Sequence, residues 1–489
     1  MSFREHQMML DKANYSVDSM KEHVKCEKFR NHFHFMAPAF WLNDPNGLIY
    51  YKGQYHMFYQ HNPYASFWGP MHWGHAVSND LVFWEHRPIA LAPSESYDNF
   101  NKGGCFSGCA VDNDGVLSLF FTACAEKVQS QCVATSTDGI RFSKHIRNPI
   151  LFSPPDCSMT DFRDPKIWRH DDLWYMIVGT CYGHIGKAAL FRSANLSDWE
   201  FAGTICGHNG KLGSIWECPD FFELHEKNIL VVSPIGAEQK NVIYLVGHMG
   251  YKDMRFQWNL QGFVDYGSDL YAPQTFLDAK GRRIMIGWLR NTMSEQDCSL
   301  LVRDIHWCGS MSIPRIIDIR EDGKLCFTPY DGLQILRHHH AVIEDKVLTE
   351  EEPLHIQAGD GLSYEIIIEF KIEDTYASEI GIVLRASDNE QTVIRININD
   401  SELILDRARS DKFKQQNMHC PIEDMEDGLL KIHLFVDISA IEIFVNDGVS
   451  VISGNIYPSS DSRNAWLYVK DGSAKIKEMN TWGLSSIWS

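Results

Sequence analysis

Short apolar runs recur along the first two thirds of the chain, and each follows a pair of turn-forming residues. The runs are four to eight residues long and rich in β-branched and aromatic residues, which indicates strands rather than helices. Five of them resemble one another: QYHMFYQH after Lys52-Gly53, VLSLFFTA after Asp114-Gly115, LWYMIVGT after Asp171-Asp172, ILVVSPIG after Lys227-Asn228 and RRIMIGWL after Lys280-Gly281. The pattern predicts an all-β fold built from internal repeats.

A second series of segments runs in step with the first. It reads AVSNDLVFWE, ATSTDGIRFS, FRSANLSDWE and VGHMGYKDMRFQW, and its aromatic residues Trp84, Phe142, Trp199 and Phe256 recur about every 57 residues. Several strands per repeat at this period are typical of a β-propeller, and five repeats predict five blades. The alternative is a β-sandwich with chance spacing, which two series in phase make improbable.

The repeat fades after about Pro314, and a different pattern begins at Leu354. Alternating strands such as YEIIIEFKI, IGIVLRA and LLKIHLFVD are separated by Asp, Asn and Gly turns, as in a β-sandwich. We therefore divide the chain into a helical N-terminal extension (1–30), a five-bladed propeller (31–335), a linker (336–350) and a C-terminal β-sandwich (351–489). The three histidines at 338–340 are assigned to the solvated linker rather than to a metal site.

Composition narrows the classes of partner. The net charge is −19 at pH 7, so nucleic acid and anionic membrane surfaces are unfavourable partners. No segment approaches 18 uncharged apolar residues, and the charged N-terminus lacks the apolar core of a secretory signal. The 13 cysteines show no regular spacing, so we expect reduced, mostly buried thiols and a cytoplasmic protein.

One polar or aromatic residue lies 8 to 11 residues before the turn that precedes each apolar run. These residues are Asp44, Ser107, Asp164, Glu217 and Tyr271. They fall at one equivalent position of an innermost strand, so three carboxylates are predicted to converge on the propeller axis. Acids that share a cleft raise at least one pKa, and such a set is what glycoside hydrolysis needs. The alternative for Asp44 alone is a turn residue in N-D-P-N-G.

Aromatic residues near these segments suggest that the cleft binds a sugar, because ring faces stack on the apolar face of a pyranose or furanose. The candidates are Trp41, Trp68, Trp73, Phe106, Trp216 and Trp288. The alternative is that tryptophans fill the spaces between blades. We prefer that alternative for Trp84 and Trp199, because they follow the structural repeat.

The motifs at these positions resemble those of glycoside hydrolase family 32, which contains invertases, inulinases, levanases and sucrose-6-phosphate hydrolases. The resemblance rests on WLNDPNG (41–47), FSG (106–108), FRDPK (162–166), WECPD (216–220) and LYAPQTF (270–276). It spans about residues 33–335, and the C-terminal part is similar to the β-sandwich module of the family. Families 43 and 68 share the five-bladed shape but resemble these motifs less.

The resemblance implies a role for each matching residue. By this resemblance, Asp44 is the nucleophile that forms a fructosyl-enzyme. Glu217 is the general acid in the first step and the general base in the second. Asp164 binds fructose hydroxyls and stabilises the transition state. Tyr271 tunes Glu217 or the intermediate. The remaining predicted pocket residues are Trp41, Asn43, Gln60, Trp68, Phe106, Ser107, Arg163 and Trp288. Such a double displacement needs no metal and no cofactor, and we expect neither.

Four functions remain open from the sequence. The first is a retaining β-fructofuranosidase that hydrolyses sucrose or short fructosides, as a monomer or homodimer, with transfructosylation as a side reaction. The second is a sucrose-6-phosphate hydrolase, for which no tight basic cluster is evident; the scattered candidates for a phosphate are Lys166, Lys187, Arg290 and Arg303. The others are a non-catalytic sugar-binding propeller, which could lose an acid, and a protein-interaction propeller, which needs no axial acids.

Overall fold

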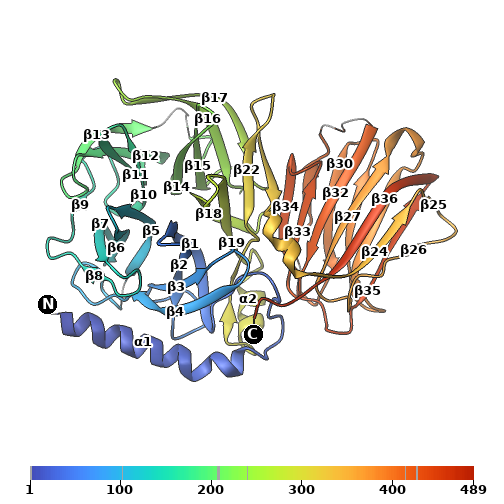
Figure 1. Ribbon diagram of the computed structural model, residues 1–489, viewed down its shortest axis with the longest axis horizontal. Coiled ribbons are helices and arrows are strands. Elements are labelled where there is room, and N and C mark those ends of the chain that lie inside the picture. Colours follow the sequence, from blue (N-terminus) through green and yellow to red (C-terminus); the bar gives the residue numbers. More distant parts are fainter. Residues whose placement is uncertain are drawn as a thin grey trace.

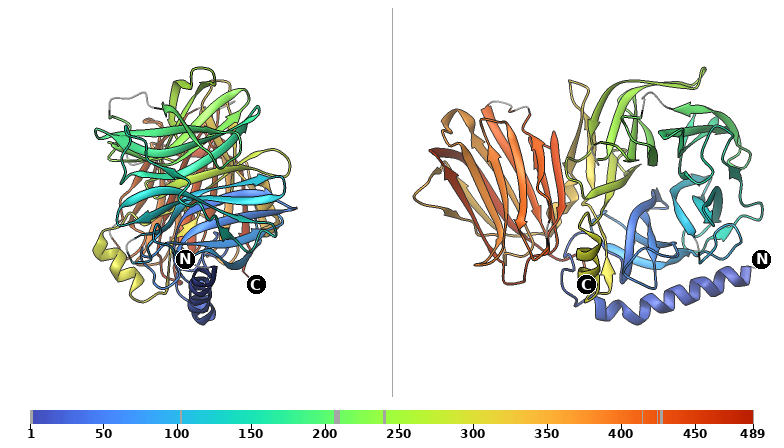
Figure 2. Two further views of the ribbon diagram at one scale, coloured as in Figure 1. Left: turned by 90° about the vertical axis from the view of Figure 1, so that its left-hand side faces the viewer. Right: turned by 180° about the vertical axis from the view of Figure 1, so that it is seen from behind.

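The computed structural model describes residues 3–101, 103–205, 210–238, 241–413, 415–423, 425 and 428–488. Most of the regular structure in them is β-strand, arranged as a ring of sheets beside a pair of stacked sheets (Figure 1). The helix α1 (Phe3–Val24) runs along the outside of the ring (Figure 2). The prediction of an all-β fold is therefore confirmed.

Five sheets form the ring and follow one another in chain order. The first contains β1 (Phe40–Tyr51), β2 (Gln54–Asn62), β3 (His72–Ser78), β4 (Trp84–Leu91) and β20 (Trp307–Cys308). The second contains β5 (Gly104–Asn113), β6 (Val116–Ala125), β7 (Val128–Ser136), β8 (Ser143–Lys144) and β9 (Leu151–Phe152). The third contains β10 (Phe162–His170), β11 (Leu173–Tyr182), β12 (Ile185–Ser193) and β13 (Glu200–Ile205).

The last two sheets complete the ring. The fourth contains β14 (Ile215–Leu224), β15 (Lys227–Ile235), β16 (Ile243–Gly250) and β17 (Arg255–Phe263). The fifth contains β18 (Leu270–Leu277), β19 (Arg283–Leu289), β21 (Ser310–Met311), β22 (Arg315–Ile319) and β23 (Leu325–Pro329). The strands β1, β5, β10, β14 and β18 contact one another in turn, and β18 contacts β1, so they surround one axis. This is the predicted five-bladed propeller.

The apolar runs that revealed the repeat form the second strand of each blade. In β2, β6, β11 and β15 nearly every residue between the strand ends is buried, on both faces of the strand. Because each blade packs against a neighbour on either side, its central strands are covered on both faces and are buried throughout instead of alternating.

Two sheets stack to form the C-terminal sandwich. One contains β24 (Arg337–Glu344), β36 (Ser473–Leu484), β27 (Tyr364–Lys371), β32 (Leu429–Val436), β33 (Ala440–Val445), β34 (Ser450–Asn455) and β25 (Val347–Thr349). The other contains β26 (Leu354–His355), β35 (Asn464–Lys470), β28 (Glu379–Ala386), β29 (Gln391–Asn397), β30 (Glu402–Arg409) and β31 (Met418–Pro421). Two short 3₁₀ turns, η1 (Asp331–Leu336) and η2 (Ile372–Asp374), lie between strands.

The expected linker at 336–350 is wrong. Residues of this segment form β24 and β25, which both pair with β36 of the sandwich, so the chain crosses between domains at η1 instead. His338, His339 and His340 lie on β24, where the ring of His340 stacks on Trp482 at 4.7 Å. An exposed edge strand of this kind carries polar residues on both faces and lacks the alternation by which strands are recognised.

The N-terminal helix covers the free edge of the first blade. Asn14 Oδ1 accepts the backbone N–H of Ile89 at 3.0 Å, and His6 Nε2 accepts that of Ala92 at 3.2 Å. Because β4 is the outermost strand of its sheet, these contacts satisfy backbone donors that would otherwise face water. Neither α1 nor α2 (Glu295–Val302) in the described residues is long and apolar enough to cross a membrane.

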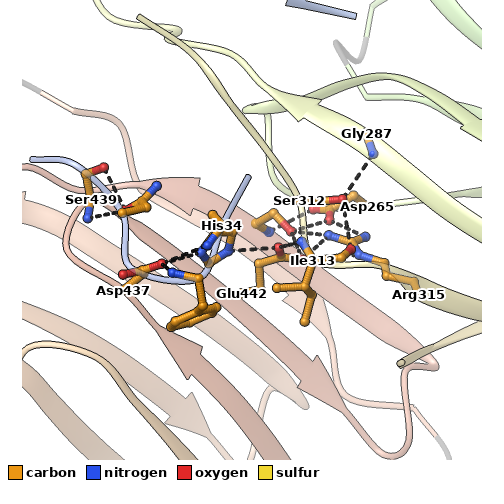
Figure 3. A network of polar contacts seen from close by, with 12 residues as sticks. His34, Asp265, Gly287, Ser312, Ile313, Arg315, Asp437, Ser439 and Glu442 are labelled. Atoms are coloured by element: carbon orange, nitrogen blue, oxygen red, sulfur yellow. Dashed lines mark hydrogen bonds and ion pairs between the residues drawn. The ribbon is translucent and has the colours of Figure 1, made fainter. Parts of the chain in front are cut away.

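A buried polar network joins the propeller to the sandwich (Figure 3). His34, which precedes β1, contacts Asp437 through Nδ1 at 2.9 Å and Glu442 through Nε2 at 3.2 Å. Arg315 of β22 pairs with Glu442 at 2.5 Å and with Asp265 at 2.9 Å. Burial lowers the pKa of His34, but the two carboxylates outweigh it and raise the pKa to about 9. We infer that His34 is an imidazolium clamped between two acids from the sandwich.

The ion pairs of His34 with Asp437 and Glu442 predict that the free energy of unfolding decreases at alkaline pH. The folded pKa of His34 lies above its unfolded value of 6.5, so its contribution is full below pH 6.5 and is lost as the pH rises through about 9. The loss is on the order of 3 kcal/mol. We expect the urea midpoint of the wild type to fall between pH 7 and 10. In His34→Gln it should fall less, and parallel curves for the two proteins would contradict the assignment.

Candidate active site

Each innermost strand carries a β-bulge at the same height on the axis. The register with the second strand of the blade slips by one residue between Leu42 and Pro45, Phe106 and Gly108, Arg163 and Lys166, Glu217 and Asp220, and Tyr271 and Gln274. A bulge turns a side chain away from the regular alternation of a strand. Five bulges around one axis therefore direct five pairs of adjacent side chains into the centre of the propeller.

The bulges correct the sequence-based equivalence by one residue. Asp164, Cys218 and Ala272 each adopt a left-handed φ, of 68°, 46° and 48°, and each precedes a proline. Glu217 and Tyr271 each lie one residue before the residue with left-handed φ. They are therefore equivalent to Arg163 in the third blade, and not to Asp164. The distance to the following turn varies between blades, and this variation hid the offset in the sequence. The side chains at the bulges consequently form two layers, an inner one that contains Asp164 and an outer one that contains Glu217.

The inner layer holds two of the predicted acids. The Ser107 hydroxyl donates to Asp44 Oδ2 at 2.5 Å, and Asn43 Nδ2 donates to Asp44 Oδ1 at 3.0 Å. The backbone N–H of Cys218 donates to Asp164 Oδ2 at 2.9 Å. The Cys218 thiol lies 3.5 Å from both Asp44 Oδ2 and Asp164 Oδ2. Asp44 and Asp164 are thus held side by side by fixed donors.

The outer layer holds the third acid between a cation and a phenol. Arg163 Nε donates to Glu217 Oε1 at 3.0 Å, and the Tyr271 hydroxyl donates to Glu217 Oε2 at 2.6 Å. The guanidinium of Arg163 is itself fixed by Asp161 at 3.1 Å and by Gln129 at 3.2 Å. Both oxygens of Glu217 therefore have a donor, and its carboxylate cannot rotate freely.

The environment raises the pKa values of the inner acids. Burial raises the pKa of Asp164 to about 7; Arg163 opposes this rise, while the negative charges of Glu217 and Asp44 add to it. Burial also raises the pKa of Asp44, and the hydrogen bonds from Ser107 and Asn43 partly offset that effect. Burial therefore favours the protonated form of Asp164 at neutral pH, while the donors around Asp44 favour its ionised form.

A third layer closes the bottom of the axis. Lys166 Nζ contacts Asp220 Oδ2 at 3.1 Å and donates to the carbonyl of Thr275 at 2.7 Å. Gln274 Nε2 donates to the carbonyl of Cys218 at 3.2 Å. These side chains are buried or nearly so. The axial cavity is therefore blind, and a ligand can enter it from one end.

The cavity above this floor has a volume of about 450 Å³. Twelve of the residues assigned to the site from the sequence line it: Trp41, Asn43, Asp44, Gln60, Trp68, Phe106, Ser107, Arg163, Asp164, Glu217, Tyr271 and Trp288. Four further lining residues were not assigned: Gln129, Thr160, Asp161 and Cys218. Thr160 and Asp161 directly precede FRDPK, and Cys218 lies inside WECPD. A partner search for the buried cation Arg163 could have found Asp161.

The aromatic candidates separate into two groups. Trp41 and Trp288 meet edge to face at 5.8 Å, and Trp68 meets Phe106 at 6.0 Å, so four rings form the wall of the cavity. Trp68 is 54% exposed and stands at the mouth. Trp73 and Trp216 are fully buried and do not line the cavity; their indole N–H groups donate to the carbonyls of Phe106 and Leu212. Their assignment to the sugar site is wrong, because they fill the blades.

One group in the described part of the chain has the geometry to hold a metal ion. It consists of His23, Glu27 and His306, which lie at the end of α1 and before β20, and none of the three lines the cavity. Glu27 accepts the backbone N–H of His306 at 2.7 Å, so this carboxylate already has a structural partner.

Three carboxyl groups with different partners in one blind, aromatic-walled cavity suit the cleavage of a glycosidic bond. Asp44 is fixed by two hydrogen bonds with its oxygens on the axis, as a nucleophile requires. Glu217 lies in the outer layer with 21% of its side chain exposed, a position that suits protonation of a leaving group. Aromatic walls and a few placed polar groups are the usual composition of a sugar site.

Comparison with known proteins gives the same result over nearly the whole chain. Residues 34–329 match the profile of the "Glycosyl hydrolases family 32 N-terminal domain", and residues 333–483 match "Glycosyl hydrolases family 32 C terminal". The boundary between the two matches falls at η1, where the structure places the passage between domains.

Named relatives cover the same length. The chain is 38% identical to a sucrose-6-phosphate hydrolase of Zymomonas mobilis, with 92% of this chain and 91% of that protein covered. It is 36% identical to a raffinose invertase of Escherichia coli, with 93% and 94% covered. A family 32 β-fructofuranosidase of Bombyx mori, solved with sucrose, is 29% identical over 98% of both chains and superposes with a TM-score of 0.82. The two matched domains together establish that the chain belongs to glycoside hydrolase family 32.

Proposed function

We propose that the chain is a retaining β-fructofuranosidase that hydrolyses the terminal β-D-fructofuranosyl bond of sucrose or short fructosides. Membership of family 32 makes it a glycoside hydrolase. The observation that carries the finer assignment is the pairing of a half-buried, doubly hydrogen-bonded Asp44 with a Glu217 of the outer layer in one blind cavity. Relatives named as invertases and fructofuranosidases support it.

The reaction proceeds in two displacements. In the first, Asp44 attacks the anomeric carbon of the fructosyl unit while Glu217 gives its proton to the glycosidic oxygen, and the glucosyl part leaves as an alcohol. In the second, Glu217 takes a proton from water, which attacks the fructosyl-enzyme and frees Asp44. Each step inverts the anomeric carbon, so the product retains the β configuration.

The other polar residues supply binding and charge stabilisation. Asp164, with a pKa near 7 in the free cavity, is placed to hold fructose hydroxyls as acceptor or donor. Its hydrogen bonds to those hydroxyls strengthen as positive charge develops on the ring. Arg163 and Tyr271 fix the orientation of Glu217 from opposite sides. Trp41, Trp68, Phe106 and Trp288 supply the aromatic wall.

The shape of the cavity favours action at chain ends. Its floor is closed by the Lys166 layer, and about 450 Å³ accommodates a fructosyl unit and the adjoining sugar. A fructosyl unit inside a long chain would need an exit at both ends. We therefore propose release of one terminal fructose at a time. Incubation with sucrose, followed by NMR of the first-formed fructose, tests the assignment; inverted product or no hydrolysis would contradict it.

A sucrose-6-phosphate hydrolase is the second candidate, because the relative from Zymomonas mobilis and others bear that name. The cavity gives it little support. Arg163 is the only Lys or Arg among its described lining residues, and this side chain is committed to Glu217, Asp161 and Gln129. None of the four scattered cations considered from the sequence lines the cavity. The acid Asp161 lies at the wall instead, where it would repel a phosphate.

We therefore expect kcat/KM on unphosphorylated sucrose to equal or exceed that on sucrose-6-phosphate. A dianionic phosphate beside Asp161, with no uncommitted cation in the cavity wall, gains no charge-assisted contact. Both substrates are measured with one enzyme preparation at low and high salt. A preference for the phosphate above about tenfold, equivalent to 1.4 kcal/mol of binding energy, would reverse the order of the two candidates.

The cytoplasmic location, the oligomeric state and the share of transfructosylation remain predictions from the sequence. The twelve cysteines in the described residues are all free, and the thirteenth, Cys206, lies outside them. The reduced thiols fit the proposed cytoplasmic location. The oligomeric state, monomer or homodimer, and the share of transfructosylation need measurement in solution.

A further inference from the structure

The sandwich reaches the strand that carries Tyr271 through a buried ion pair. Arg407 of β30 lies 2.7 Å from Asp269, which comes just before β18, and both side chains are 1% exposed. The backbone N–H of Asn455, at the end of β34, donates to the same Asp269 oxygen at 2.9 Å. Asp269 is two residues from Tyr271, so the sandwich fixes the entry of this catalytic strand.

The sandwich also holds the partner strand of Tyr271. Asn455 Nδ2 donates to the carbonyl of Arg290, just after β19, at 2.9 Å. The N–H of Arg290 donates to the carbonyl of Asp269 at 2.8 Å, and the Arg290 guanidinium lies 3.9 Å from the centre of the Tyr271 ring. The guanidinium of Arg290 therefore packs on the face of the Tyr271 ring, and the backbone of Arg290 is bound by Asn455 of the sandwich.

From Tyr271 one hydrogen bond leads to the catalytic acid, because its hydroxyl donates to Glu217 Oε2 at 2.6 Å. We propose that the C-terminal sandwich orients the general acid of the propeller, with Arg407 and Asn455 as positioning residues that act through Asp269, Arg290 and Tyr271. The inference rests on the proposed role of Glu217. It gives the second domain a part in the reaction although the cavity itself is lined by propeller residues alone.

The arrangement is distinct from the rest of the domain interface. The His34 and Arg315 network also joins the domains, but its ion pairs connect His34 and Arg315 to Asp437, Glu442 and Asp265 and not to Asp269 or Arg290. Arg407 instead forms an ion pair with Asp269. Its guanidinium also donates hydrogen bonds to Gln415 Oε1 and to the carbonyls of Gln416 and Asn455. A guanidinium fixed on so many sides sets the position of Asp269 rigidly.

The test compares two leaving groups in Arg407→Met. A displaced acid slows cleavage of sucrose, whose leaving alcohol needs a proton, more than cleavage of 4-nitrophenyl β-D-fructofuranoside, whose phenolate does not. The quantity compared is kcat/KM, which covers only the steps up to the fructosyl-enzyme. We expect a loss of about 10- to 100-fold on sucrose, the size expected for a misplaced catalytic group, and less than about threefold on the aryl fructoside.

Arg385→Met is the matched control. Arg385 is also a 1% exposed arginine of the sandwich, but its guanidinium donates to backbone carbonyls of the sandwich, including those of Ser462, Asp437 and Ile438. It should lower the melting temperature and leave the ratio of the two kcat/KM values at that of the wild type. In a Tyr271→Phe background, Arg407→Met should add little to the loss on sucrose, because the two act through one contact.

Each result decides the question. Equal losses on both substrates, or no loss on sucrose, would overturn the proposal. If Arg407→Met does not fold, Asn455→Ala replaces it with the same criteria, since it removes the side-chain bonds to the Arg290 carbonyl and to Asp269 Oδ2 and keeps the backbone bond to Asp269. Arg407→Lys should restore part of the sucrose activity by keeping a charge near Asp269. A wild-type enzyme inactive on both substrates would instead refute the proposed function, so the two failures are distinguishable.

Discussion

Asp44→Asn should reduce kcat on sucrose by a factor on the order of 10⁴ or more, because it removes the group that forms the covalent intermediate. An amide is too weak a nucleophile to replace the carboxylate at the anomeric carbon. Turnover is measured by glucose release over hours, with the enzyme at micromolar concentration. The predicted loss is in kcat rather than in KM, because the fructose-binding partners of the cavity are unchanged.

The fold should survive this substitution. The amide oxygen of Asn can accept from Asn43 Nδ2, as Asp44 Oδ1 does. The amide nitrogen can then face the Ser107 hydroxyl, which accepts as readily as it donates. Removing one of two adjacent acids in the cavity also relieves their repulsion. The melting temperature should therefore stay at or above that of the wild type. Near wild-type turnover would exclude Asp44 as the nucleophile.

The internal repeat allowed us to predict from the sequence which strands surround the propeller axis. Each blade contributes one apolar central strand and one polar position before it, so the recurrence of both fixes where the innermost strands lie. Asp44, Asp164 and Glu217 could be assigned to one cavity because their phase in the repeat is a property of the chain alone. The family motifs then added the roles that phase cannot supply.

The division of the axial acids into an inner and an outer layer could not be predicted from the repeat. A bulge adds a residue without any change in composition, so the offset between Asp164 and Glu217 follows from strand register and backbone φ rather than from spacing. Gln129 and Asp161 line the cavity but were missed because they lie outside the repeated position and are recognised by their contacts with Arg163. Trp73 and Trp216 were assigned wrongly because a tryptophan one residue from a motif can point into the blade as easily as into the cavity.

Long-range contacts were the least predictable part. Arg407 and Asp269 are 138 residues apart in the chain and lie in different domains, and neither residue belongs to a repeated motif. Charged residues at such distances pair in a way that only the packing of the two domains decides. The same holds for His34, which lies just before the first blade and meets two acids of the sandwich.

Glu217→Gln should lower kcat/KM on sucrose by about 10²- to 10⁴-fold, the usual worth of general acid catalysis. The loss should be much smaller on 4-nitrophenyl β-D-fructofuranoside, since a phenolate leaves without a proton. The geometry tolerates the change. The amide oxygen must face Arg163, which can only donate, and the amide nitrogen then faces the Tyr271 hydroxyl. That hydroxyl can accept this N–H and turn its own proton to the carbonyl of Ser233, 3.2 Å away.

The second half of the reaction gives an independent measurement on the same variant. Without Glu217 as base, water attacks the fructosyl-enzyme slowly, so the aryl fructoside should show a burst of 4-nitrophenol followed by a slow steady state. Azide needs no base and should accelerate that steady state, with β-fructofuranosyl azide as the product. Asp44→Asn, which cannot form the intermediate, should show neither burst nor azide effect. Equal losses of Glu217→Gln on both substrates, without a burst, would place the acid on another residue of the cavity.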